Sequence, residues 1–245
     1  MGVVVVFGAT GGIGQALVRR LRRGGRPVHL AARDESRLRA LATDVDAGFS
    51  VADARDAGAV QAALQAASAH GVVDGVVGAV GSIALRPLHL TRDEDFDDAI
   101  AQNLKTAFFI ARAAVRSFQQ SKAAGSIVLF SSAAARAGLP SHEAIAAAKA
   151  GVDGLVRSTA ATYASARIRI NAIAPGLVDT PLAARLLSTP AAREASEQRH
   201  PLGRIGQPDE VAALAALLLS DDAASITGET FGLDGGLALL RPLRA

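Results

Sequence analysis

The side chains and turns that could do chemistry lie far apart in this sequence. The turn GATGGIG puts glycines at Gly8, Gly12 and Gly14, directly before a helical stretch. Small residues let a backbone approach a pyrophosphate closely, and the first turn of a helix offers unpaired N–H groups and a favourable dipole. The turn therefore predicts a dinucleotide site that includes Thr10 and Ile13, with a tight turn that binds nothing as the alternative.

The end of the second apolar run, HLAARDESR, indicates which dinucleotide is bound. At this position NAD-binding proteins place an acid against the ribose 2′-hydroxyl, whereas NADP-binding proteins place an arginine near the 2′-phosphate. The usual position of the acid is Ala32, and the next residue is Arg33, whose planar guanidinium suits a phosphate. We therefore expect NADP(H) to be preferred over NAD(H). Asp34 and Glu35 are the residues that argue for NAD(H).

A histidine and a lysine occur at helical spacing in the later stretch SHEAIAAAKAG. Lys149 has apolar neighbours, where a lysine either extends to solvent or has a partner. His142 lies seven residues earlier, which is two turns along the same helical face. A histidine can donate a proton near neutral pH, so His142 is a possible acid. The alternative is a loop histidine that caps the helix with Ser141.

Composition limits the classes of function. The chain has 245 residues, half of them hydrophobic, which suits one large α/β domain or two small ones. It has no cysteine, which excludes disulfides and thiolate chemistry, and we expect no metal site. The net charge is +3 and the basic residues are dispersed, unlike those of a nucleic-acid-binding protein. No apolar run reaches the roughly 20 residues of a membrane span, and we find no signal peptide, so we expect a cytoplasmic protein.

The elements that must position these residues alternate between strands and helices. VVVVF, residues 3–7, is a short apolar run typical of a strand buried on both faces. Strands are also predicted in PVHLAA, GFSVAD, VDGVVGAV, GSIVLFSS and RIRINAIAP, and helices in GQALVRRLRRGG and DESRLRALATDV, the latter capped by Asp34 or Ser36. This order predicts one domain over residues 1–245 with a doubly wound parallel sheet. Residues 178–208 are irregular and predict a lid or substrate loop.

In this order the segments resemble the short-chain dehydrogenase/reductase family. The resemblance covers essentially the whole chain, through the glycine turn and the segments VADARD, QNLKTAFFIARA, GSIVLFSSAAARAG, AAAKAGVDGLVRSTA, RIRINAIAPGLVDTPL and PLGRIGQPDEVAALAALLLSDDAASITGETFGLDGG. It implies a Rossmann-like sheet of about seven parallel strands with helices on both faces. It also implies an oxidoreductase with a dinucleotide cofactor, a small-molecule substrate and a homodimeric or homotetrameric assembly.

The resemblance also implies roles for individual residues. Asn103 matches the asparagine that organises a water relay, and Ser132 matches the serine that orients the substrate carbonyl. Lys149 matches the lysine that binds the nicotinamide ribose and lowers the pKa of a tyrosine. Asp53 matches the acid that holds the adenine amino group. The loop at the nicotinamide, its carboxamide and the phosphates is matched by Pro175, Gly176, Val178 and Thr180.

The chain departs from the family where the family's acid should be. The motif YxxxK reads IAAAK, so Ile145 stands in the place of the tyrosine that protonates the carbonyl oxygen. The motif NNAG reads GAVG, and Phe7 replaces the usual threonine before the glycine turn. The chain's single tyrosine, Tyr163, lies fourteen residues beyond Lys149, roughly 21 Å along a continuous helix, and we expect it to pack. His142 has the spacing of the tyrosine in a divergent enoyl-reductase branch, YxxMxxxK.

Three functions remain open from the sequence. The one we adopt is an NADP(H)-dependent oxidoreductase whose proton donor is His142, Ser132 or a water held by Asn103 and Lys149. The second is reduction of a conjugated enone or enoyl thioester, where Ser132 and Lys149 form an oxyanion site. The third is a cofactor-binding protein without catalysis, either a sensor or a subunit that assembles with an active paralogue.

Overall fold

The chain forms a seven-stranded parallel sheet with helices on both faces. The computed structural model describes residues 2–241, so residue 1 and residues 242–245 of the predicted domain lie outside the described residues. The sheet order is β3-β2-β1-β4-β5-β6-β7, and every neighbouring pair is parallel. This confirms the predicted doubly wound sheet. The strands are β1 Val3–Phe7, β2 Val28–Ala32, β3 Gly48–Val51, β4 Val73–Gly78, β5 Gly125–Phe130, β6 Ile168–Pro175 and β7 Thr230–Leu233.

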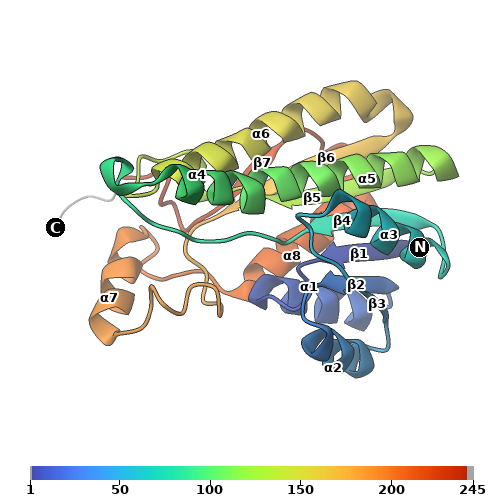
Figure 1. Cartoon of the computed structure of the whole chain (residues 1–245), viewed down its shortest axis with the longest axis horizontal. Helices are drawn as coiled ribbons and strands as arrows, with labels where there is room; N and C mark the ends of the chain where they lie inside the picture. The colour runs from blue at the N-terminus through green and yellow to red at the C-terminus, as the bar shows by residue number, and fades with distance from the viewer. Residues whose placement is uncertain (1, 242–245) are drawn as a thin grey trace.

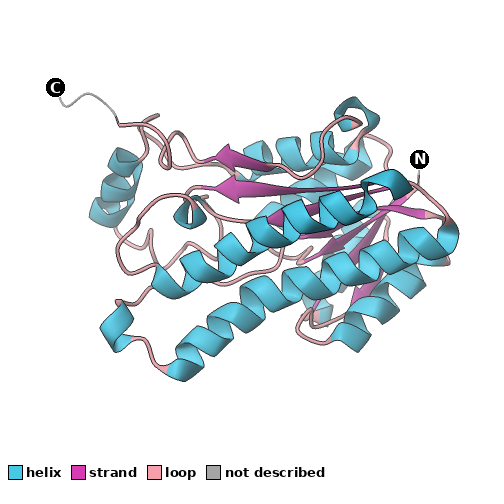
Figure 2. Cartoon of the chain, turned by 90° about the horizontal axis from the view of Figure 1, so that it is seen from above, coloured by secondary structure: helices cyan, strands magenta, loops and turns pink. Residues whose placement is uncertain are grey.

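The helices divide into two layers, one on each side of the sheet (Figure 1). One hydrophobic core joins the sheet to α3, α5 and α6, and the other joins it to α1, α2 and α8. Figure 2 shows α5 and α6 as two long helices side by side. The bounds are α1 Gly12–Arg23, α2 Glu35–Val45, α3 Ala57–Ser68, α4 Asp93–Ile100, α5 Thr106–Ser121, α6 Glu143–Tyr163, α7 Pro190–Arg199 and α8 Pro208–Leu219. Short helical turns include η1 Leu88–Leu90, η2 Ala101–Lys105 and η3 Ala133–Ala135.

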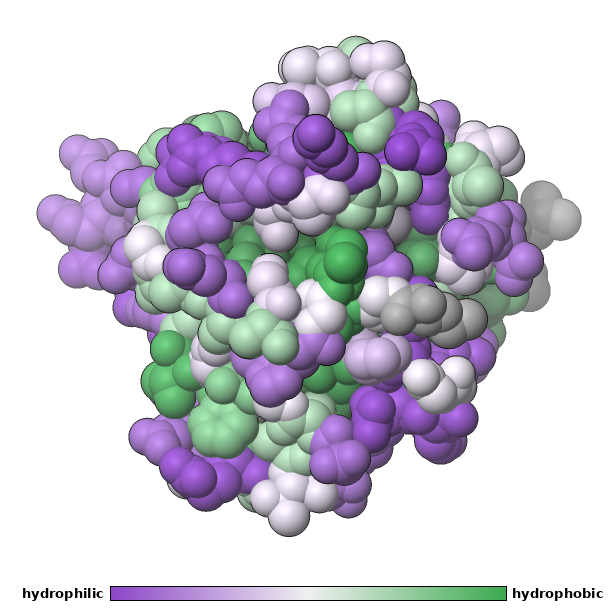
Figure 3. Space-filling view, turned by 90° about the vertical axis from the view of Figure 1, so that its right-hand side faces the viewer, coloured by the Kyte–Doolittle hydropathy of each residue, from purple (hydrophilic) through white to green (hydrophobic). Residues whose placement is uncertain are grey.

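The strand order creates a crevice at the carboxyl ends of β1 and β4. All five residues of β1 are buried, because the strand is apolar on both faces and helices cover both. From β1 the chain winds outward to β2 and β3, then returns to β4 on the other side. Ligands of open α/β sheets bind where the strand order reverses in this way. The opposite end of the molecule, where the strands begin, carries polar residues that surround an apolar area (Figure 3).

The segment predicted as a lid contains one helix and is held together by two contacts within the segment itself. Thr189 caps α7 by accepting a hydrogen bond from the Ala192 N–H at 3.1 Å, and proline opens the helix. An isolated bridge pairs Val178 with Gly206, and an ion pair of 3.0 Å joins Asp179 to Arg193 of α7. Motion of this segment as a lid stays a prediction. Within residues 2–241, no helix is both long and apolar enough to span a bilayer.

Candidate active site

A cleft of about 770 Å³ lies at the carboxyl ends of β1 to β4. The glycine turn forms one wall. Gly8 has a φ of +77°, and a Cβ placed on it would lie 2.3 Å from the Ala79 carbonyl oxygen. A Cβ on Gly14 would lie 2.2 Å from the Gly8 carbonyl oxygen. No other residue type fits at these positions, so backbone rather than side chains forms this wall of the cleft.

The amino terminus of α1 opens into this cleft without a protein group to cap it. Its N-cap residue is Gly11, which has no side chain, and the first turn contains no acidic residue. By contrast, Asp34 caps α2 and Asp56 caps α3 through side-chain oxygens. The free N–H groups and the helix dipole of α1 therefore favour an anion. These features fit the pyrophosphate of a dinucleotide.

Three arginines line the far end of the cleft. Arg33 is exposed, and Arg37 donates from Nη2 to the Thr10 carbonyl of the glycine turn at 2.7 Å. The Arg55 side chain donates hydrogen bonds of 2.7, 3.0 and 3.2 Å to the carboxylate of Asp53, and this contact lowers the pKa of Asp53. Asp53 therefore lies in the cleft but is already paired, and its contact with an adenine stays a prediction.

The sequence alternatives for the α2 cap are resolved in favour of Asp34. Its Oδ1 accepts hydrogen bonds from the Arg37 N–H at 3.0 Å and from the Ser36 hydroxyl at 2.8 Å. Sequence reasoning missed Arg37 and Arg55 as cleft residues. Arg37 could have been found, because it lies three residues after the cap and therefore beside the helix terminus. Arg55 follows no pattern that places it next to Asp53 in the cleft.

A second cavity of about 150 Å³ adjoins the cleft. The two spaces share a wall made of Ile13, Ala79, Val80, Gly81, Thr180 and Leu182. Asn103, Ser132, Lys149 and Ile145 all line the smaller cavity, so the fold brings together residues that are separated by up to 46 positions in the sequence. In the described part of the chain, Lys149 is the one ionisable side chain that lines it.

Asn103 lies in the π-helical turn η2 between α4 and α5 and is 1% exposed. A π-helical turn is wider than an α-helical one and recurs at functional sites. The Asn103 amide donates to the Ala99 carbonyl at 3.0 Å and to the Ser82 hydroxyl at 3.1 Å, and its Oδ1 accepts the Ser82 N–H at 3.1 Å. The side chain therefore holds Ser82 at the cavity wall.

Lys149 joins α6 to the end of β5. Its Nζ donates to the Phe130 carbonyl at 2.8 Å, and the Ser131 hydroxyl donates to the Lys149 carbonyl at 3.3 Å. Burial lowers the pKa of Lys149 to about 8, against the opposing effect of the Asp153 carboxylate one helical turn away. A Cβ added to Gly81 would lie 3.4 Å from Nζ and 2.9 Å from the Asn103 Oδ1, so glycine keeps a polar notch open between them.

Ser132 and Ile145 complete the polar and apolar sides of the cavity. The Ser132 Oγ accepts the Ala134 N–H at 3.1 Å, which leaves its hydroxyl proton for another acceptor. Ile145 is buried and lies one helical turn before Lys149 on α6. An isoleucine offers this cavity no proton.

His142, considered as a proton donor, and Tyr163, the single tyrosine of the chain, lie elsewhere. His142 is not among the described residues that line the cavity. Its Nδ1 lies 2.7 Å from the Pro140 carbonyl oxygen. Because a carbonyl only accepts, Nδ1 carries the proton in this contact. Tyr163 is the last residue of α6 and packs, partly buried, against the core that joins the sheet to α3, α5 and α6, which confirms the packing role expected for it.

The loop after β6 closes the cavity on the cofactor side. Pro175, Gly176 and Val178 line the cavity, and Thr180 lines both spaces. A Cβ on Gly12 would lie 2.7 Å from the Thr180 Cγ2, so this loop meets the glycine turn directly. The structure therefore brings the predicted phosphate and nicotinamide residues to opposite sides of one opening, while their contacts with a cofactor stay predictions.

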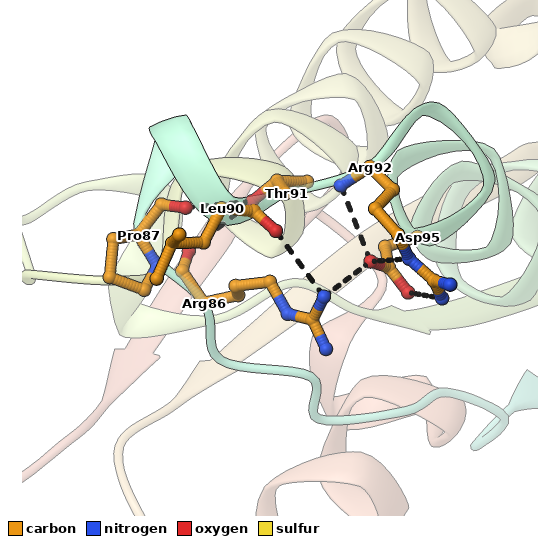
Figure 4. Close-up of polar contacts among 6 residues, drawn as sticks. All are labelled: Arg86, Pro87, Leu90, Thr91, Arg92 and Asp95. Atoms are coloured by element: carbon orange, nitrogen blue, oxygen red, sulfur yellow. Dashed lines mark hydrogen bonds and ion pairs between the residues drawn. The ribbon is translucent and has the colours of Figure 1, made fainter.

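The outer wall of the cavity is a segment anchored by a cluster of charges (Figure 4). Asp95 accepts hydrogen bonds from Arg86 at 2.8 Å and from Arg92 at 2.9 Å, and these contacts hold the pKa of Asp95 well below its usual range. The Arg86 N–H also donates to the Ser141 carbonyl just before α6, at 2.9 Å. Arg86 thus joins its segment to α4 and to the residues just before α6, and Ser82 and Ile83, which line the cavity, come shortly before it in the chain.

Comparison with known proteins agrees with this geometry. A family model described as Enoyl-(Acyl carrier protein) reductase matches residues 8–238. A tropinone reductase homologue of Arabidopsis thaliana is 35% identical over 242 residues, covering 96% of this chain and 92% of the relative. Among solved structures, a variant actinorhodin polyketide ketoreductase with NADPH has a TM-score of 0.92 at 29% identity, covering 97% of both chains.

A gluconate 5-dehydrogenase from Burkholderia cenocepacia, in complex with NADP and tartrate, has a TM-score of 0.91 at 28% identity and covers 98% of this chain and 96% of its own. The matches span almost the full length of both partners and include dehydrogenases and reductases. The chain belongs to the short-chain dehydrogenase/reductase family of oxidoreductases.

Proposed function

We propose that this protein is an NADP(H)-dependent oxidoreductase that interconverts a carbonyl compound and an alcohol without a tyrosine acid. The observation that carries the proposal is the shared wall between the two spaces. The large cleft suits a dinucleotide, and the small cavity presents a hydroxyl, an amide and an ammonium to whatever lies beside it. When bound, the dinucleotide supplies or accepts the hydride.

The basic rim of the cleft supports a preference for NADP(H). Arg33 follows β2 directly and Arg37 lies in the first turn of α2, and both line the cleft where a 2′-phosphate would be recognised. Asp34, the acid that could instead hold a ribose hydroxyl, is engaged in capping α2. Two structural relatives are described with NADPH or NADP. Arg33 and Arg37 would hold the phosphate, and the amino terminus of α1 would hold the pyrophosphate.

The proton is assigned to Lys149 in this proposal. Lys149 lines the cavity, and its lowered pKa of about 8 makes it a competent acid near neutral pH. Ser132 orients the substrate oxygen by donating a hydrogen bond from its hydroxyl group. Lys149 then transfers to that oxygen the proton that it acquires on reduction. To act as the proton donor, His142 would have to leave its contact with Pro140 and reach the cavity, so we prefer Lys149.

Reduction of a conjugated C=C bond is the alternative, favoured by the description of the matching family model and by the apolar residues that line the cavity. These residues include Ile83, Leu177, Leu182 and Ala183. In this case Ser132 and Lys149 stabilise the developing oxyanion of an enone or enoyl thioester. A cofactor-binding protein without catalysis is the third outcome of the experiment below.

A cofactor titration followed by a turnover screen separates these functions. We expect calorimetry to show tighter binding of NADPH than of NADH, and turnover with at least one ketone, enone or enoyl thioester. Turnover of ketones only supports carbonyl chemistry, and turnover of enones or enoyl thioesters only supports the alternative. Tight NADPH binding with no turnover would indicate the non-catalytic protein, and absence of NADPH binding would contradict all three.

A further inference from the structure

His200 joins helix α7 to the wall of the small cavity. It follows the last residue of α7 and is 4% exposed. Both ring nitrogens face backbone groups. Nδ1 lies 2.8 Å from the Ser196 carbonyl oxygen within α7, and Nε2 lies 3.2 Å from the backbone nitrogen of Leu177. Leu177 lines the small cavity but not the cofactor cleft.

These two contacts are compatible with one protonation state of the ring. The Ser196 carbonyl can only accept, so Nδ1 must carry a proton. The Leu177 N–H can only donate, so Nε2 must be without one. The neutral Nδ1–H tautomer satisfies both, whereas an imidazolium would place two donors face to face. A lost hydrogen bond would leave the Leu177 N–H unpaired at a partly buried position.

The surroundings of His200 leave little freedom for another arrangement. A Cβ on Gly176 would lie 2.7 Å from Nε2, so the ring approaches the backbone more closely than any other residue type would allow. The Leu177 carbonyl accepts the Gly206 N–H at 2.8 Å, which fixes the other side of the same peptide segment. The ring therefore acts directly on the position of Leu177.

Among residues 2–241, the charged groups near His200 offer the imidazolium no hydrogen-bonded partner. On α7 the neighbouring charged residues are Glu197 and Arg199. The turn packed against the ring contributes Asp234, whose carboxylate accepts the N–H groups of Gly236 and Ala238, each at 2.9 Å. The segment that accepts the ring, Gly176 to Val178, carries no charge.

We propose that His200 is a positioning residue that holds Leu177 at the cavity wall, and that it does so only as the neutral Nδ1–H tautomer. Protonation of the ring releases Leu177 and, with it, the wall of the small cavity from α7. Loss of this contact weakens substrate binding and leaves the cofactor cleft intact. The kinetic consequence rests on the proposed oxidoreductase function, whereas the protonation state and the bond to Leu177 do not.

Nitrogen-15 NMR of the full chain tests the protonation state directly. At pH 7.5 the His200 resonances should show a protonated Nδ1 and an unprotonated Nε2, and the Leu177 amide should exchange slowly with solvent. His200→Phe should speed that exchange about tenfold, because the N–H loses its acceptor. The opposite tautomer, an imidazolium at pH 7.5, or unchanged exchange in a folded His200→Phe variant would overturn the proposal.

Steady-state kinetics at saturating NADPH tests the consequence. His200→Phe should raise the substrate KM about tenfold and leave the NADPH Kd within about twofold. His200→Gln keeps a side-chain acceptor for the Leu177 N–H, so its KM should stay within about twofold of the wild-type value. His89→Gln, which removes an exposed imidazole, should follow the wild type.

The outcomes separate the two proposals. An unchanged KM in His200→Phe, or a KM in His200→Gln that rises as much as in His200→Phe, would overturn the positioning role while turnover itself continues. If the wild type binds NADPH but turns over no substrate, the oxidoreductase proposal fails, and the NMR and exchange results still decide whether His200 holds Leu177.

Discussion

Replacing the buried Lys149 with methionine should stabilise the fold at neutral pH. Burial lowers the lysine pKa from 10.5 to about 8. Below pH 8 the side chain is charged in both states, and the charge is less favourable in the buried site than in the unfolded chain, which destabilises the fold. The difference of about 2.5 between these pKa values corresponds to about 3 kcal/mol. Methionine has a similar length, but it gives up the hydrogen bond to the Phe130 carbonyl, which costs about 1 kcal/mol. The net expectation at pH 7 is a stabilisation of about 2 kcal/mol.

The effect has a pH signature. Because the folded pKa lies below the unfolded one, the unfolded state binds more protons between pH 8 and 10.5, and wild-type stability rises through this range. The advantage of Lys149→Met should therefore be largest below pH 8 and should shrink by about 1.3 kcal/mol between pH 7 and pH 9.

Urea unfolding at pH 7, 8 and 9, at one protein concentration, measures this difference. Lys105→Met is the matched control, because it removes an exposed lysine from the neighbouring helical turn, and its effect should change much less with pH. A Lys149→Met variant whose advantage stays constant or grows as the pH rises would refute the buried ammonium.

Three further predictions concern catalysis, cofactor and assembly. Ile145→Tyr puts a phenol one turn from Lys149, so it should raise NADPH-dependent reduction of an activated ketone about 100-fold, measured at saturating cofactor; a variant that binds NADPH normally yet gains nothing would show that more than an acid is missing. Arg33→Ala should weaken NADPH about tenfold in calorimetry and leave NADH unchanged; equal losses for both would speak against a 2′-phosphate contact. Light scattering at micromolar concentration should report a dimer or tetramer, paired through α5 and α6, and a strict monomer would contradict this.

Much of the fold could be predicted because its signals are local. The run at residues 3–7 is fully apolar, with four β-branched valines before Phe7, and it forms β1 with the predicted bounds. Asp34 begins α2 because a carboxylate before a helix accepts its first free N–H groups. The glycine turn packs as tightly as its composition indicates, since no Cβ fits at Gly8 or Gly14.

The site was predictable only where the family pattern supplied it, because its contacts join distant segments. Asn103 holds Ser82, twenty-one residues away, and His200 holds Leu177, twenty-three residues away, and neither pair has a local signature. The helical-face argument for His142 assumed that the helix includes it. Instead α6 begins at Glu143, and His142 has φ −108° and ψ 11°, so helical periodicity does not set the direction of its side chain.

The most direct test of the proposed function is isotope transfer from NADPH deuterated at both C4 positions. The protein is incubated at saturating cofactor with a panel of ketones, enones and enoyl thioesters, and the products are analysed by mass spectrometry. The proposal predicts a reduced product that carries one deuterium on carbon, formed at a rate that falls strongly in Lys149→Met under the same saturating conditions. Tight binding of NADPH with no deuterium in any product would contradict it.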